Sequence, residues 1–186
     1  MIPVKRRDFM RGAALGALAF TVGGAQMWLT AREAHAQNVP YRLLKAGEAE
    51  TLGALGETLL PGARAAGFVH FIDQQCSVPP EDALLEARIL NVRPPYVNFY
   101  RTAIGAIDRA AEKRSGRRFA QLDAIEQHEF VDLMRQNKLD GWQGPPGPFV
   151  YLIARSDAVD VVYGTMEGYE ALGIPYMAHI APDRRW

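Results

Sequence analysis

The chain has very few of the residues that build disulfides and metal cages. Cys76 is the only cysteine among 186 residues. It cannot form a disulfide within one chain, a Cys-x-x-Cys-His haem attachment or a cysteine-bound iron–sulfur cluster. A single cysteine in an oxidising compartment is either a buried apolar residue or bonded to another chain. The sequence leaves both readings of Cys76 open.

An excess of charge of either sign is also lacking. Twenty-one basic side chains balance 21 acidic ones. The chain therefore offers no electrostatic footprint for nucleic acid and no polybasic patch for a membrane surface. We expect no nucleic-acid partner.

Catalytic and cofactor motifs are absent as well. The sequence contains no Gly-rich nucleotide loop, no Gly-x-Ser-x-Gly elbow and no His-Glu-x-x-His. His70, His128 and His179 fall in three separate predicted elements, so a metal triad is not expected. We expect no catalytic, cofactor-binding or metal-binding residue in this chain.

Two pairs of acidic residues have the spacing of neighbours on a helix. Asp157 and Asp160 form one pair, and Glu167 and Glu170 form the other. Residues three apart share a helix face. Because nothing in the sequence places a nucleophile near them, we interpret both pairs as solvated polar faces.

The first residues have the layout of an export signal. The stretch 5–11 (KRRDFMR) resembles a twin-arginine signal, in which Arg6, Arg7 and Phe9 are the recognition residues. An apolar run rich in Ala and Gly follows over residues 13–24. This export route carries folded proteins, so the resemblance implies that the chain, or a partner it carries, folds before export.

A cleavage position follows this run. Ala34 and Ala36 give the small-x-small pattern before Gln37. The alternative is a retained membrane anchor, because residues 12–31 lack charged side chains over a length that could span a bilayer. Glycines and polar residues within that run favour cleavage. We therefore predict a signal peptide over 1–36 and one domain over 37–186.

Helical periodicity dominates the rest of the chain, and strand-like alternation is nearly absent. The sequence predicts an all-α, compact, irregular domain of five to six helices with an extended C-terminal tail. The predicted helices cover about 46–60, 65–75, 81–89, 96–114 and 124–138, and a last one begins near 149 and has an uncertain end near Gly164.

Two of these helices carry clear boundary signals. The segment 96–114 has a continuous apolar stripe, follows Pro94-Pro95 and is followed by Gly116, a standard stop. Asp123 and Glu126 form a variant of the capping box and predict the start of the next helix.

Aromatic and large apolar side chains crowd the last 45 residues. The Gly- and Pro-rich loop 139–148 and the Pro-containing tail 174–186 cannot be regular helix. Aromatic residues and Met are enriched at the cores of protein interfaces. Some of these side chains could instead close the domain's own core. We predict a partner surface that includes Trp142, Tyr163, Tyr169, Tyr176, Met177, Ile180 and Trp186.

Several stretches of the chain have the pattern of one known family. The opening motif is Glu57–Ala63 (ETLLPGA) followed by Gly67–Asp73 (GFVHFID). Further stretches are Phe119–Leu122, Trp142–Pro146, Val161–Tyr169 and Leu172–Ile180. Together they resemble the gluconate 2-dehydrogenase subunit 3 family.

The resemblance implies a role in a larger complex. Such small subunits accompany a large FAD-dependent subunit of the glucose-methanol-choline type, which oxidises a sugar or alcohol in the periplasm. A multi-haem cytochrome c subunit often completes the complex and passes electrons to the inner membrane. The small subunit carries the twin-arginine leader and brings the folded, FAD-loaded partner through the export machinery. It holds no cofactor, and the family assigns it no catalytic residue.

Two alternatives stay open at this stage. One is a membrane-anchored structural subunit of the same kind of complex, with the leader retained. The other is a stand-alone metal-dependent enzyme, which the lack of a ligand cluster disfavours.

Overall fold

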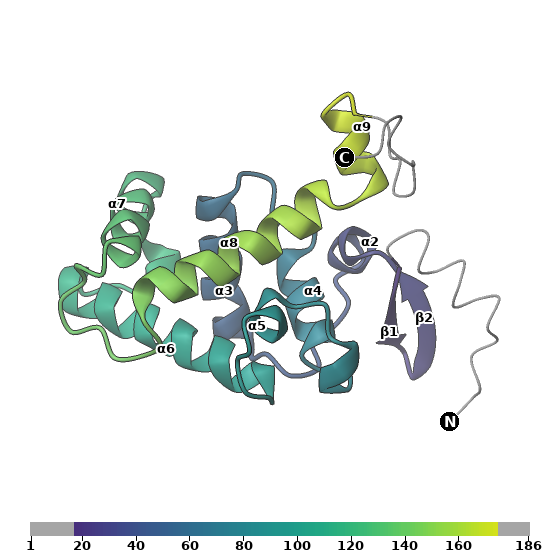
Figure 1. Ribbon diagram of the computed structural model, residues 1–186, viewed down its shortest axis with the longest axis horizontal. Coiled ribbons are helices and arrows are strands. Elements are labelled where there is room, and N and C mark those ends of the chain that lie inside the picture. The colour runs from purple at the N-terminus through teal and green to yellow at the C-terminus, as the bar shows by residue number, and fades with distance from the viewer. Residues whose placement is uncertain (1–16, 175–186) are drawn as a thin grey trace, which may run out of the picture.

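The computed structural model describes residues 17–174, which form a bundle of helices with one small two-stranded sheet at its side (Figure 1). The all-α prediction is confirmed. Within this part of the chain there are eight α-helices, and the five longest build the body: α3 (Ala46–Leu59), α4 (Phe68–Gln75), α6 (Tyr96–Ser115), α7 (Ala124–Arg135) and α8 (Gly147–Tyr163).

Helix α3 is the centre of the bundle. It packs against α4, α6, α7 and α8, and α8 crosses the bundle in Figure 1. Leu52 and Leu55 on α3 are each 1% exposed. Facing helices add Ile72, Ile107, Phe130 and Ile153, all fully buried. Burial of this apolar stripe, rather than helix propensity, supplies most of the stability of such helices.

The predicted bounds of α3, α6 and α7 agree with the structure to within a few residues, but two other regions differ. Helix α4 begins at Phe68, three residues later than predicted, because Gly67 has φ 87° and breaks the helix before it. The segment predicted over 81–89 is divided into η1 (Pro80–Asp82) and α5 (Glu86–Ile89). Ala83 and Leu85 have extended backbone and separate the two turns.

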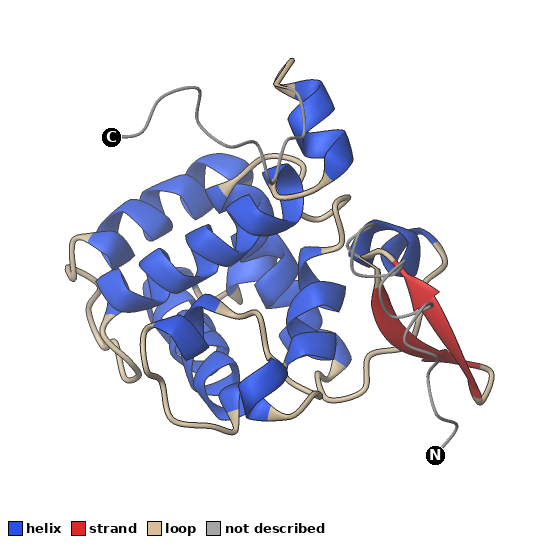
Figure 2. Ribbon diagram, turned by 45° about the vertical axis from the view of Figure 1, so that its right-hand side comes forward, coloured by secondary structure: helices blue, strands red, loops and turns tan. Residues whose placement is uncertain are grey.

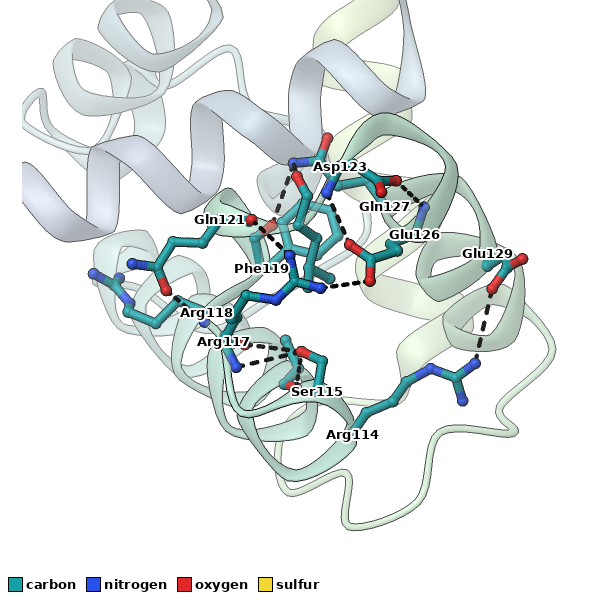
Figure 3. Close-up of polar contacts among 12 residues, drawn as sticks. Arg114, Ser115, Arg117, Arg118, Phe119, Gln121, Asp123, Glu126, Gln127 and Glu129 are labelled. Atoms are coloured by element: carbon teal, nitrogen blue, oxygen red, sulfur yellow. Dashed lines mark hydrogen bonds and ion pairs between the residues drawn. The ribbon is translucent and has the colours of Figure 1, made fainter.

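The connection from α6 to α7 is held by local polar contacts (Figure 3). Helix α6 ends at Gly116, which has φ 72°, and η2 (Phe119–Gln121) follows. The predicted capping box is confirmed: Asp123 accepts from the Glu126 N–H at 2.9 Å, and Glu126 accepts from the Asp123 N–H at 3.0 Å. Arg117 pairs with Glu126 at 2.5 Å.

Helix α8 stops at Tyr163 and does not continue through Gly164. A new helix, α9 (Met166–Ala171), starts after Thr165, whose hydroxyl accepts from the Gly168 N–H at 3.1 Å. A methyl group on Gly168 would collide with the backbone of Val162 and Tyr163. This close approach lets the chain turn sharply between the two helices.

A β-hairpin lies within the segment that the sequence presents as an apolar leader (Figure 2). Strand β1 (Leu18–Val22) pairs antiparallel with β2 (Ala25–Leu29). The turn residues Gly23 and Gly24 both have positive φ, as a two-residue type I′ turn requires. The sequence does contain a signal for this hairpin, because the Gly-Gly pair lies between segments with β-branched and aromatic residues. The same apolar composition also fits the core of an export signal, which is how we interpret the segment from its sequence.

The hairpin leads into a short helix, α2 (Ala31–Ala36), which packs on α4. Thr30 and Glu33 form a complete capping box at its start. Phe20, Leu29, Ala34 and Val39 make a second apolar cluster, separate from the main core.

Candidate functional site

A buried carboxyl group joins α8 to two other elements. Asp157 accepts from the Tyr100 hydroxyl at 2.5 Å and from the Glu86 N–H at 2.9 Å. It is fully buried, so the expectation that it faces solvent is wrong. Burial raises its pKa to about 7 against these two donors. The contacts place this carboxyl between helices, where it holds α5 and α6 to α8.

Two further polar groups also connect parts of the fold. Asp73, on α4, accepts hydrogen bonds from the N–H groups of Arg42, Leu43 and Leu44 at 2.7 to 2.9 Å. These bonds hold the loop before α3 against α4. Arg118 donates to Asp108 at 2.5 Å and links η2 to α6. The hydrogen-bond donors to Asp157, Asp73 and Asp108 named above all belong to the protein's own fold, so these carboxyl groups have structural roles.

Within residues 17–174, no group of three or more His, Cys, Asp or Glu side chains could hold a metal ion. His70 is buried on α4, where its Nε2 lies 2.9 Å from the Val39 carbonyl oxygen, and burial lowers its pKa. His128 is exposed on α7. The predicted separation of these two histidines is confirmed, and His179 lies outside the described residues.

A hollow lies where the hairpin, α4 and the end of α8 meet. It has a volume of about 840 Å³ and a mostly apolar lining. Its size falls in the range of small-molecule sites. The described residues that line it include no histidine, cysteine or serine, and its two threonines, Thr30 and Thr165, cap helices. It is therefore suited to binding and carries no nucleophile–base pair.

A second, shallower hollow of about 370 Å³ adjoins the first along α8. It is lined by residues of α5 and α8, and Asp160 borders both hollows. Asp160 is an exposed residue whose carboxyl group is partly desolvated, and this desolvation and the neighbouring Glu86 raise its pKa. Both hollows therefore lie beside α8.

Three large, exposed apolar side chains line these hollows. Leu152 and Val159 are 48% and 37% exposed on one stripe of α8, because they lie seven residues apart. We call the following set the α8 face: Leu84, Leu152 and Val159, which are exposed and line the two hollows. Exposed apolar groups gathered in this way mark interaction sites.

The structure brings together only part of the predicted partner surface. Tyr163 ends α8 and Tyr169 lies on α9, and both are half-buried. Trp142 lies in the loop before α8, and this 17-residue helix, about 25 Å long, separates it from Tyr163. Its indole N–H donates to the Pro145 carbonyl at 2.7 Å, and its ring packs on the core. Tyr176, Met177, Ile180 and Trp186 lie outside the described residues.

Cys76 follows α4 and carries a free thiol. It is half-buried against the main core. Burial raises the pKa of this thiol. A thiol with a raised pKa is a weak nucleophile.

The residues predicted for export fall in two places. Arg6, Arg7 and Phe9 lie outside the described residues. Ala34 and Ala36 lie in α2, where Ala34 is fully buried and Ala36 is exposed. Among the described helices, none is long and apolar enough to cross a membrane.

The fold and this surface define a class of protein: a helical domain with exposed apolar side chains along one of its long helices. Residues 46–177 match the family model of gluconate 2-dehydrogenase subunit 3. Because the match covers more than half of the chain, the protein belongs to this family. No curated protein and no solved structure matches the chain.

Proposed function

We propose that this chain is the non-catalytic small subunit of a periplasmic dehydrogenase complex. Its partner is a large FAD-containing subunit of the glucose-methanol-choline type, which oxidises a sugar, alcohol or gluconate. A multi-haem cytochrome c is the electron acceptor in the complex and associates it with the inner membrane. The small subunit carries the export signal and escorts the folded flavoprotein through the twin-arginine route.

Family membership is the observation that carries this proposal, because the family is described as one subunit of a larger enzyme. The surface chemistry supports it. A chain whose task is binding needs an apolar patch with a polar rim. The α8 face provides the apolar side chains, and Glu86, Arg155 and Asp160 surround the hollow beside them.

The α8 face is the part of the surface that we propose contacts the flavoprotein. Its residues Leu152 and Val159 lie on the 17-residue helix α8, which is fixed to the bundle by Asp157. Side chains on a rigid helix lose little conformational freedom when they bind a partner, so the entropic cost of binding is small. Residues near the centre of such a patch carry most of the binding energy.

Co-purification of the two subunits tests this assignment. Val159→Asp places a charge in the proposed interface, and we expect it to weaken binding of a tagged flavoprotein by at least about tenfold, since hot-spot changes exceed roughly 1.4 kcal/mol. Affinity is measured by titration of the purified chains. The bound FAD of the partner reports that the flavoprotein itself is intact.

Ile125→Asp is the matched control. Ile125 is 73% exposed on α7, away from the α8 face, so the same chemical change there leaves affinity unchanged. Equal affinity of both variants and the wild type would remove the α8 face from the interface. Absence of any complex in the wild type would refute the accessory-subunit proposal itself.

A further inference from the structure

The predicted cleavage position lies inside a folded and docked segment. The Ala36–Gln37 bond is the end of α2, and the Gln37 N–H donates to the Glu33 carbonyl at 2.9 Å. Two residues later the Val39 N–H donates to the Ala34 carbonyl at 3.0 Å. These bonds close the helix end, with Asn38 at φ 51° as its left-handed cap.

Apolar packing holds this segment on the domain. Phe20 and Leu29 of the hairpin are 4% and 6% exposed, and Ala34 of α2 is fully buried with them. The His70 ring on α4 lies against this cluster, with ring centroids 6.4 Å from Phe20 and 5.6 Å from His35. Residues 18–36 therefore form a continuous cover over one end of α4.

The fit between α2 and α4 is close at one glycine. Gly67 directly precedes α4 with φ 87°, and a methyl group there would collide with the carbonyl group of Ala31 at the start of α2. A glycine is needed at this position for two reasons: the left-handed backbone and the close approach of α2. Only the second reason depends on docking.

A peptidase binds the residues that precede the scissile bond in its active-site cleft, so these residues must first be released from the fold of the substrate. Proteolysis of folded proteins accordingly occurs at exposed, unfolded segments or after local opening. Ala34 is the third residue before the bond, and docking buries it completely. We propose that residues 18–36 dock on α4 as a cover, and that the Ala36–Gln37 bond is cut only when this cover opens.

The same docking bears on the alternative of a retained membrane anchor. A spanning helix needs about 20 consecutive apolar residues. Residues 18–29 are instead paired as β1 and β2 in the docked state. Cleavage and membrane insertion of this segment thus share one requirement, which is undocking from α4.

Cleavage of the purified full chain by signal peptidase in detergent micelles tests the proposal. The product beginning at Gln37 is followed by intact mass and N-terminal sequencing. Gly67→Ala pushes α2 away from α4, and we expect it to be cut at least about tenfold faster than the wild type, because opening controls the rate. No flavoprotein is present, so the outcome is independent of partner binding.

Gly62→Ala is the matched control. Gly62 has φ 90°, so its alanine carries similar backbone strain, but the added methyl group meets no atom within 4 Å. We expect this variant to be cut at the wild-type rate.

A second pair of variants keeps the test valid if Gly67→Ala does not fold. Phe20→Ser weakens the buried cluster, and Met27→Ser changes a side chain of the same hairpin that is 40% exposed.

Several outcomes would overturn the proposal. One is equal cleavage rates for the wild type, Gly67→Ala and Phe20→Ser, as measured on chains whose circular dichroism shows folded helices. Another is the absence of cleavage in all variants and in a peptide of residues 1–45, because undocking would then not expose a usable bond. Faster cleavage confined to Gly67→Ala and Phe20→Ser supports the cover.

Discussion

At the scale of single residues, Asp157 links the stability of the protein to pH. Its pKa is about 7 in the folded protein, because burial opposes ionisation, and 3.8 is the ordinary value. At a pH between these two pKa values, the carboxyl group is protonated in the folded state and ionised in the unfolded state. Stability from this group is therefore full below about pH 4 and is lost as the pH rises through about 7.

Asp157→Asn tests this link. The amide does not ionise, so the fall in unfolding free energy between pH 4 and 7, which reaches about 1.4 kcal/mol per pH unit for one proton, should disappear from the variant. Urea denaturation at a series of pH values measures it. Glu170→Gln, an exposed change on α9, should keep the wild-type slope. A slope that survives in Asp157→Asn would show that another group is responsible.

Asp157 also shows what sequence reasoning could not reach. Its spacing to Asp160 is that of a solvated pair, and for Asp160, which is exposed, that reading is right. The partners that bury Asp157 are Tyr100 and the Glu86 N–H, which lie 57 and 71 residues away in the chain. Contacts at such separation are set by packing and leave no local signal.

At the scale of elements, the capping box of α7 is a local device with a local effect. Asp123 accepts the Glu126 N–H at 2.9 Å, and Figure 3 shows this contact beside the Arg117–Glu126 pair. Asp123→Ala should lower the free energy of unfolding by about 1 kcal/mol, the usual effect of losing such a cap. Thermal denaturation followed by circular dichroism measures the change.

The control for this variant is Asp140→Ala. Asp140 is an exposed residue of the loop before α8, so its loss should change stability by less than about 0.5 kcal/mol. If both variants were equally stable, the contact at Asp123 would contribute nothing to α7.

Elements with strong boundary signals were predicted well, and the others were not. Helix α6 lies between Pro95 and Gly116, and α7 starts at Asp123, so each carries its limits in its own sequence. The hairpin carries the Gly23–Gly24 turn, but its apolar composition equally fits an export core. What selects the hairpin is a tertiary contact of Phe20 with α4 residues such as His70, which a local pattern cannot contain.

At the scale of the whole molecule, the two ends of the described chain meet at one hollow. It is lined by residues of the hairpin and α2 and by residues from the end of α8 and from α9. The family match begins at residue 46, so the hairpin and α2 precede the matched region and yet line the hollow with it. Under the proposed function, the second half of the predicted signal peptide thus lies next to the proposed partner surface.

This arrangement leads to a prediction about export of the whole complex. Arg6→Lys with Arg7→Lys keeps the charge but removes the planar guanidinium groups, which lysine does not replace. Since we propose that the flavoprotein crosses only with this subunit, both chains should stay in the cytoplasm, and periplasmic dehydrogenase activity should fall at least about tenfold. Cell fractionation and immunoblotting of both chains measure it. Arg11→Lys, the same change outside the pair, should leave export intact. Dehydrogenase activity that persists in the periplasm of the double variant would show that the flavoprotein does not depend on this leader.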